Sequence, residues 1–417
     1  MKVVHIGTHE QEGGAARAMY RLHTGLLRQG VESVIFCMHA RSNSSSVVQF
    51  TPTRTLSLRV KRSWRHRQLS KQKEVIAGRE PNAGTFSPDR TPYREDLMNQ
   101  LPDADLYHLH WVSGFLDLPS FFEKLDKPVV WTLHDMNPFT GGCHYDNGCG
   151  RFAGTCGACP QLEAEQESDL SREVYSRKQK AISAFPNESL RVAADSHWLA
   201  EEAARSGIFG GKEIETIHYG LDHELFAPGC KHSARKELEL ASGTPVVLFG
   251  AHQVSHARKG LDILRKALSI LDPSISGMCL VTFGDGDIEP LPGMEQRHLG
   301  PVWDDRKLAR VYHAADLFVI PSRQEAFGQT CMEAMACGIP CAGFRTGGIP
   351  DMIEEGVTGS LAEPGSPEAL AEAISRTLKE KEQLGKNARS MVEQAFTLKH
   401  QADSYLRAYQ GLLQHSN

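Results

Sequence analysis

Residues 321–340 read PSRQEAFGQTCMEAMACGIP and carry the strongest structural signal in the chain. The apolar run just before them, 317–320, predicts a buried strand, and a loop carrying Glu325 follows it. A helix is expected to begin near 327–330 and to end at 338–340, because glycine can adopt a left-handed C-cap conformation and proline cannot continue a helix. Strand, loop and helix in this order build open parallel α/β sheets, and they place Glu325 beside a helix N-terminus.

The same alternation of short apolar runs and helical patterns extends over both halves of the chain. It predicts an α/β fold with two Rossmann-like parallel-sheet domains. We divide the chain into an N-terminal domain over 1–220, a C-terminal domain over 221–395 and a closing helix over 396–417, with the join near 218–228, where Gly and Pro interrupt the pattern. The predicted strands lie near 3–6, 34–38, 106–110, 128–133 and 192–195, and then near 245–249, 279–283, 317–320 and 341–344.

Composition limits the classes of protein to which the chain can belong. The net charge of −5 argues against a protein that binds nucleic acid through bulk positive charge. No apolar run approaches the roughly 18–20 residues that span a bilayer, and the opening apolar run breaks too early for a signal peptide. Six of the ten cysteines are scattered, as is typical of free thiols in a reducing compartment, so we expect a cytoplasmic protein.

The loop after the strand at 317–320 has groups suited to a phosphorylated sugar. Helix N-termini offer free N–H groups to anions, and carboxylates accept hydrogen bonds from sugar hydroxyls. We therefore predict that Glu325 and Glu333 contact sugar hydroxyls. The residues whose N–H groups, with one hydroxyl, would face a phosphate are Phe327, Gly328, Gln329 and Thr330.

A second glycine-containing turn lies between the first predicted strand and its helix. Gly13 and Gly14 lack Cβ atoms, so a donor molecule could approach the backbone where that helix begins. A tight turn without a ligand is an equal alternative. A dinucleotide site is disfavoured, because the turn has no G-x-G-x-x-G motif and no acidic residue ends the second strand at 37–39.

The string from Glu325 to Glu333 resembles the E-x7-E signature of the retaining glycosyltransferases of family 4, whose GT-B architecture has two Rossmann-like domains facing a central cleft. Over 110–111 and 132–135 the chain is similar to the members that build bacterial surface polysaccharides. The resemblance is absent over 40–100. Further segments that resemble family elements are 258–264, 298–302, 346–351 and 356–359.

The resemblance implies roles for individual residues. Glu325 would hold hydroxyls of the donor sugar, Glu333 the nucleotide ribose, and Lys259 with Arg258 the diphosphate. The chain departs from the family at 250–252, which reads Gly-Ala-His where Gly-Arg is common, and Arg258 would replace the missing arginine. Neutralising the diphosphate matters because the leaving group departs with negative charge.

His134 follows an apolar strand, and strand ends face the ligand crevice in open α/β sheets. The family's equivalent histidine lies near the donor sugar, which implies a catalytic role here. A histidine that only hydrogen-bonds Asp135 is the alternative. The family also implies retention of anomeric configuration, and we expect front-face displacement, in which the departing phosphate oxygen takes the acceptor proton. No catalytic metal is expected, because Asp285-Gly286-Asp287 follows a strand as a turn would.

The expected reaction is transfer of a sugar from a nucleotide-sugar donor, UDP- or GDP-linked, to a saccharide or polyprenyl-linked acceptor in polysaccharide or glycoconjugate biosynthesis. Two alternatives stay open. One is a nucleotide-sugar hydrolase or epimerase of the same fold, and the other is a non-catalytic protein that binds sugar nucleotides.

Four cysteines cluster in a glycine-rich loop at 141–160. Cys143, Cys149, Cys156 and Cys159 are separated by five, six and two residues. Four thiolates can form a tetrahedral zinc site that orders a segment too polar to fold on its own core. We favour a structural zinc ion that shapes the acceptor side, with disulfides and free thiols as alternatives.

The segment 54–73 holds eight Lys or Arg residues and no acid. Leu56, Val60 and Trp64 are spaced one helical turn apart, which predicts a basic amphipathic helix. Such a helix can lie on anionic lipid at the inner face of the membrane, where a polyprenyl-linked acceptor would reside. A solvated basic face is the equal alternative.

Overall fold

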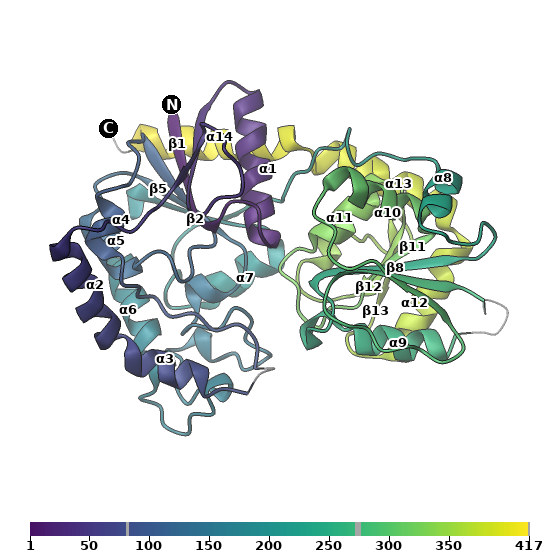
Figure 1. Cartoon of the computed structure of the whole chain (residues 1–417), viewed down its shortest axis with the longest axis horizontal. Helices are drawn as coiled ribbons and strands as arrows, with labels where there is room; N and C mark the ends of the chain where they lie inside the picture. The colour runs from purple at the N-terminus through teal and green to yellow at the C-terminus, as the bar shows by residue number, and fades with distance from the viewer. Residues whose placement is uncertain (81–82, 272–276, 416–417) are drawn as a thin grey trace. The chain divides into compact units, whose positions relative to one another are not determined.

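Two parallel β-sheets organise the chain in this computed structural model (Figure 1), which describes residues 1–80, 83–271 and 277–415. The α/β fold with two parallel-sheet domains is therefore confirmed. One compact unit contains Met1–His218 and Gln401–Asn417, and the other contains Tyr219–His400.

The N-terminal unit has a seven-stranded sheet of order β3-β2-β1-β4-β5-β6-β7, and all its neighbouring strands are parallel. Its strands are β1 (Lys2–His9), β2 (Glu32–His39), β3 (Val47–Gln49), β4 (Leu106–Leu109), β5 (Val129–Leu133), β6 (Leu190–Ala194) and β7 (Ile214–Thr216). Its helices are α1 (Gly14–Arg28), α2 (Leu56–Gln68), α3 (Ser70–Ala77), α4 (Arg94–Met98), α5 (Leu118–Lys124), α6 (Leu170–Ala184), α7 (His197–Arg205) and most of α14 (Leu398–His415).

The C-terminal unit has a six-stranded sheet of order β10-β9-β8-β11-β12-β13, which is also parallel throughout. Its strands are β8 (Val246–Gln253), β9 (Cys279–Asp285), β10 (Glu295–His298), β11 (Leu317–Ile320), β12 (Cys341–Phe344) and β13 (Gly359–Ala362). Its helices are α8 (Lys231–Glu237), α9 (Leu261–Ser269), α10 (Asp305–Ala314), α11 (Gln329–Ala336), α12 (Pro367–Lys379) and α13 (Lys381–Ala395).

Each sheet reverses its strand order at one place, between β1 and β4 in the first unit and between β8 and β11 in the second. Ligands of open α/β sheets bind outside the carboxyl ends of the strands at such a reversal. The loop that carries Glu325 follows β11, and the segment that begins at His110 follows β4. The candidate residues therefore lie where each sheet can take a ligand.

The C-terminal helix α14 packs on the sheet of the N-terminal unit (Figure 1, yellow). Tyr405 and Tyr409 are fully buried against apolar residues of β1, β4, β5 and β6. Their hydroxyls also meet polar side chains of the sheet, since Tyr409 lies 2.7 Å from Nδ1 of His108 and Tyr405 lies 2.6 Å from Oγ1 of Thr132. The helix α14 is thus part of the hydrophobic core of the N-terminal unit.

The basic segment 54–73 forms two helices, α2 and the start of α3, because the helix breaks at Leu69. The apolar stripe on α2 faces outward, with Leu56, Val60 and Trp64 exposed by 76%, 59% and 61%. In the described part of the chain, no helix is both long and apolar enough to cross a membrane.

We expect Gly260→Ala to lower the free energy of unfolding by about 3 kcal/mol, because overpacking costs about 1–3 kcal/mol and left-handed backbone about 1 kcal/mol more. Gly260 has a φ of 74°, and a Cβ there would lie 1.9 Å from the carbonyl oxygen of Pro321. Gly356 has a similar φ of 72° in open space, so Gly356→Ala should lose only about 1 kcal/mol. Denaturant unfolding of both variants measures the difference, and equal losses would contradict the close approach.

Candidate functional site

The loop after β11 brings the first predicted cluster together in the C-terminal unit. Helix α11 begins at Gln329 with Gly328 as its N-cap, close to the predicted start. Gln329 and Thr330 are half-buried in its first turn, where backbone N–H groups have no partner within the helix. The sequence therefore located both the loop and the helix N-terminus beside it.

Glu325 is the centre of this cluster and is only 7% exposed. Its Oε2 atom accepts hydrogen bonds from Nζ of Lys259 at 2.5 Å and from Oγ of Ser322 at 3.0 Å. A guanidinium nitrogen of Arg258 lies 3.6 Å from the same oxygen. Burial alone would raise the pKa of Glu325, but the charges of Lys259 and Arg258 and these hydrogen bonds outweigh it and hold the pKa below its usual value. The carboxylate is therefore ionised and held between two cations.

Two backbone contacts fix the position of this loop. The N–H of Gly348 donates to the carbonyl oxygen of Glu325 at 2.9 Å, and the N–H of Arg323 donates to that of Arg258 at 2.8 Å. Arg323 also makes a bidentate pair with Asp262 at 2.9 and 2.7 Å. Sequence reasoning missed this pair, because its members are 61 residues apart and no spacing along the chain links the two segments that carry them.

Glu333 lies inside α11 and is 2% exposed. The hydroxyl of Tyr312, on α10, donates to its Oε2 at 2.8 Å, a partner that no spacing in the sequence indicated. The ring of Phe327 packs edge-on against Tyr219 and Phe396, so only its backbone can serve a ligand. The structure thus places the carboxylate of Glu333 beside a phenol hydroxyl within the core.

The turn between β1 and α1 lies in the N-terminal unit. Gly13 is the N-cap of α1, with a φ of 87°, and Gly14 is exposed as the first residue of that helix. The preceding Glu10 is fully buried and accepts the N–H groups of Arg41 and Ser42 at 2.5 and 2.8 Å. This carboxylate, which sequence reasoning missed, ties the turn to the segment after β2.

His134 belongs to a row of buried histidines in the same unit, which runs from the middle of β1 to the ends of β4 and β5. Its Nε2 atom lies 2.9 Å from Nδ1 of His110, and Nε2 of His110 lies 3.0 Å from Nδ1 of His5. Burial lowers the pKa of His134 to about 4, although the charge of Asp135 opposes this shift. Burial also lowers the pKa of His110 and His5 far below the usual value, so all three rings are neutral near pH 7.

Asp135 is held by two neighbours that the sequence did not reveal. Its Oδ2 atom lies 2.6 Å from Nδ1 of His144 and accepts the indole N–H of Trp111 at 2.9 Å. The N–H of Asn137 donates to Oδ1 at 2.9 Å. Burial would raise the pKa of Asp135, but the charge and hydrogen bond of His144 hold it below its usual value. His110, Trp111, His134 and Asp135 line one pocket, with Ser113 and Asn137 among its other walls.

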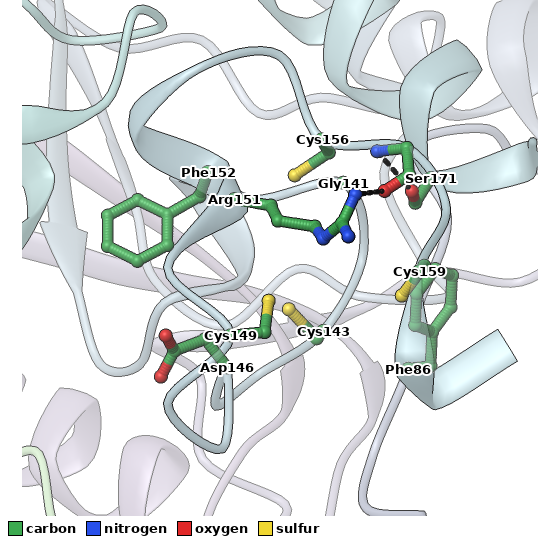
Figure 2. A pocket seen from close by; sticks show the side chains of 11 residues that line it. Phe86, Gly141, Cys143, Asp146, Cys149, Arg151, Phe152, Cys156, Cys159 and Ser171 are labelled. Atoms are coloured by element: carbon green, nitrogen blue, oxygen red, sulfur yellow. Dashed lines mark hydrogen bonds between the residues drawn. The ribbon is translucent and has the colours of Figure 1, made fainter. Parts of the chain in front are cut away.

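The four clustered cysteines line a separate pocket in the same unit (Figure 2). Cys143 and Cys159 are buried, Cys149 and Cys156 are half-buried, and all four are free thiols. A second candidate ligand set was not predicted: ring nitrogens of His5, His108 and His110 lie within 4.8 Å of one another. Both nitrogens of His108 already meet hydroxyls, those of Tyr409 and Thr132, so this trio serves the hydrogen bonding of the core.

The fold, with the cluster around Glu325 and the pocket of His134, is that of a class of protein, the glycosyltransferases of GT-B fold. The model of Glycosyltransferase Family 4 matches residues 12–225, which is more than half of the chain, and the model of Glycosyl transferases group 1 matches residues 244–380. The chain belongs to glycosyltransferase family 4.

Two curated relatives are named for the same activity. D-inositol 3-phosphate glycosyltransferase of Segniliparus rotundus is 30% identical over 54% of this chain, and the match spans only 53% of that relative. D-inositol 3-phosphate glycosyltransferase 1 of Catenulispora acidiphila is 30% identical over 72% of this chain and 71% of its own length.

Two solved structures share the fold at lower identity. Sucrose-phosphate synthase from Thermosynechococcus elongatus has a TM-score of 0.67 at 19% identity, covering 99% of this chain and 100% of its own. Anabaena Alr3699/HepE, in complex with UDP and glucose, has a TM-score of 0.66 at 17% identity, covering 98% and 99%.

We expect the N-terminal unit to lose stability as the pH falls from about 6.5 to about 4. The pKa of His134 is lowered to about 4 in the folded chain, whereas it is near 6.5 in the unfolded chain. Between these two pH values the imidazole is therefore protonated in the unfolded chain and neutral in the folded chain, which favours unfolding. This residue should contribute no loss above pH 7 and about 2 kcal/mol of loss at pH 5. Denaturant unfolding at pH 7 and pH 5 measures the loss, which His134→Gln should reduce and the exposed control His232→Gln should not. The same loss in all three proteins would contradict the assignment.

Proposed function

We propose that the chain transfers a sugar, with retention of anomeric configuration, from a nucleoside-diphosphate sugar to a hydroxyl group of a saccharide or lipid-linked acceptor. The observation that carries this proposal is the ionised Glu325, held by Lys259 and Arg258 beside the N-terminus of α11. The loop after β11 carries a carboxylate that can accept sugar hydroxyls and leads into a helix N-terminus suited to a phosphate, and the segment before α9 brings two cations for a diphosphate beside it. Family membership supports the reaction class.

In this proposal the diphosphate of the donor replaces Glu325 as the partner of Lys259 and Arg258. The charge that develops on the leaving diphosphate then meets cations that are already in place, which stabilises the transition state. Glu325, released from Lys259, accepts hydroxyls of the donor sugar, and Glu333 accepts those of the ribose. The departing phosphate oxygen takes the proton of the acceptor hydroxyl, so the protein mainly positions groups and stabilises charge.

The donor base that we favour is uridine, with guanosine as the alternative. The support for uridine is the fold shared with Alr3699/HepE, which was solved with UDP and glucose. The first two curated relatives act, by name, on D-inositol 3-phosphate, and we propose instead a saccharide or polyprenyl-linked acceptor of a surface polysaccharide. The support for that choice is the His110-Trp111 and His134-Asp135 lining of the N-terminal pocket.

Within the N-terminal unit, the neutral His134 would present a ring or backbone group to the donor sugar or the acceptor. Because its pKa is lowered to about 4, it would act as a neutral hydrogen-bonding group and not as a cation. No metal ion takes part in the proposed transfer. A structural zinc ion on the four cysteines would be separate from this chemistry.

We expect Glu325→Gln to lower kcat/KM for transfer by about 10²–10³-fold, because the neutral amide can no longer match the two cations or accept sugar hydroxyls equally well. Glu372→Gln, at an exposed glutamate on α12, is the matched control and should keep full activity. The measurement is transfer from UDP- and GDP-sugars to saccharide acceptors, followed with and without acceptor.

Three outcomes separate the candidate functions. Turnover that needs an acceptor supports transfer, whereas equal turnover without acceptor indicates a hydrolase or epimerase. Thermal stabilisation by one nucleotide sugar without any turnover indicates a binding protein, since ligand at 100 times its Kd adds about 2.7 kcal/mol. Activity of Glu325→Gln equal to the control would contradict the proposed site.

We further propose that α2 lies on anionic lipid, where a polyprenyl-linked acceptor would be presented. Leu56, Val60 and Trp64 form an exposed apolar stripe. The Lys and Arg residues of α2 differ in their partners: Arg62 and Arg65 pair with buried carboxylates of Asp96 and Asp117, and the exposed Lys61 pairs with Glu95. Arg59 and Arg67 are exposed. The paired arginines anchor the helix, and the exposed ones are available to lipid phosphates.

Trp64→Ala should weaken binding to vesicles of phosphatidylcholine and phosphatidylglycerol roughly ten-fold, because a large apolar side chain contributes about 1.5–3 kcal/mol on burial. Co-sedimentation measures the bound fraction. The matched control is Trp303→Ala, at a tryptophan that is 50% exposed in the C-terminal unit. Equal effects of both variants, or equal binding to pure phosphatidylcholine, would contradict the docking of α2.

A further inference from the structure

The loop of Cys143, Cys149, Cys156 and Cys159 has features that the transfer reaction does not use. All four residues line one pocket between Phe86 and the start of α6 (Figure 2). No three of their Sγ atoms lie within 4.8 Å of one another in the described chain, so a shared ligand would draw them closer. The pocket is small, and its ligating atoms are sulfurs with one neighbouring carboxylate, that of Asp146.

Backbone groups act on the pKa of two of the four cysteines. Burial raises the pKa of Cys159 and of Cys156, and backbone hydrogen bonding at Gln161 and Leu162 for the former and at Gly141 for the latter opposes that rise. Such hydrogen bonds stabilise negative charge on sulfur, which a thiolate carries and a disulfide sulfur does not.

Two cations interact electrostatically with cysteines of this loop. The buried ammonium of Lys178 is close enough to interact with Cys143 and Cys156, and Arg79 interacts with Cys143 and Cys159. Lys178 is held in place by the carbonyl oxygens of Asn137 and Thr140, at 2.5 and 3.1 Å. A divalent ion with four thiolates carries two negative charges, and these two cations would balance them.

The backbone of this loop is held in conformations that need support. Asn147, Cys156, Ala158 and Glu163 have left-handed φ values between 40° and 52°, which L-residues rarely adopt. Each costs of order 1 kcal/mol and persists only where surrounding contacts hold it. The apolar contacts of Cys143 and Cys159 with Phe86 form a small cluster, so a further constraint would strengthen this loop.

We propose that these four cysteines bind one structural zinc ion. On binding, four thiols lose their protons to the buffer and form four Zn–S bonds, with no change of oxidation state. Zinc matches four sulfur ligands in a tetrahedral site, whereas magnesium and calcium prefer oxygen ligands. The ion is distinct from the sugar-transfer chemistry, so failure of this proposal leaves the proposed reaction untouched.

The ion also acts on the candidate site through the residue after Cys143. The segment around His144 is paired with two neighbours: the N–H of Ser87 donates to Gly142, and the N–H of Met136 donates to His144, at 2.8 and 3.0 Å. The ring of His144 holds Asp135, which follows His134 directly. Zinc on Cys143 therefore fixes the position of His144 against Asp135.

The test begins with the whole native chain, purified through a peptide tag that needs no metal and without chelator. We expect one zinc ion per chain by inductively coupled plasma mass spectrometry, and ten reduced cysteines by intact mass after denaturation and alkylation. A zinc-free chain whose four loop thiols are reduced would overturn the proposal. So would a zinc-free chain in which those four are oxidised to disulfides.

Variants assign the ligands. Cys149→Ser should lower zinc affinity by more than the roughly 10–100-fold that is typical for loss of an outer-shell partner. Cys230→Ser, at an exposed cysteine of the C-terminal unit, should keep one zinc ion and is the matched control. Zinc retained equally by both variants would overturn the assignment, even though the native chain binds the metal.

Amide hydrogen exchange tests the link to the candidate site without an activity assay. After zinc is released by a mercurial reagent with chelator, exchange should accelerate at Met136, His144 and Ser87. It should stay unchanged in β11, which serves as the internal control. Unchanged exchange at all of these positions would show that the ion does not order the segment beside Asp135.

Discussion

Burial on both faces is the constraint that shapes each sheet of this chain. The central strands β1, β4, β5, β8, β11 and β12 are covered almost completely, so side chains in their middle can only pack. Chemistry is thereby confined to the carboxyl ends of strands, and above all to the two places where the strand order reverses. Glu325 lies at the carboxyl end of β11, which borders one reversal, and His134 lies at the carboxyl end of β5, one strand beyond the other. The ionised Glu325 remains buried there only because Lys259 and Arg258 accompany it, since a lone buried carboxylate would be strongly unfavourable.

The sheet of the N-terminal unit is also buried on both faces, but it contains polar side chains that need hydrogen-bond partners. His5, His108 and His110 are buried side by side on β1 and at the end of β4. A neutral imidazole has one donor and one acceptor, so the hydrogens along His5, His110 and His134 must all point the same way. The tautomer of His134 is therefore linked to that of His5, two hydrogen bonds away. The tyrosine hydroxyls of α14 form the two ends of a neighbouring series of hydrogen bonds that runs through His108 and Thr132. These bonds explain why the helix α14 belongs to this unit.

The sequence predicted the parts of the fold that local patterns determine. Central strands are apolar throughout, and glycine and proline mark their ends, so β11, α11 and the position of Glu325 were located to within a few residues. The edge strands β3, β7, β10 and β13 were missed. Half-exposed strands such as Glu295–His298 carry polar residues and no apolar run, and β13, although buried, is short and contains Gly359 and Ser360. Partners from distant segments were missed for a different reason. Tyr312 beside Glu333 and His144 beside Asp135 come from neighbouring elements of the fold, and no spacing along the chain encodes those contacts.

Backbone contacts with the segment of Gly347 and Gly348 hold the loop around Glu325. A Cβ on Gly347 would lie 1.9 Å from the carbonyl oxygen of Glu325, so the backbones of the two segments touch, and the N–H of Gly348 fixes their register. Backbone contacts therefore hold Glu325 in place, independently of its side-chain partners. In the proposed reaction, Lys259 would exchange the carboxylate for the diphosphate of the donor by rotating its own side chain, while the loop stays where it is. Since reorganisation during the reaction costs free energy, this division between a fixed backbone and exchangeable side-chain pairs is what electrostatic stabilisation of a leaving diphosphate requires.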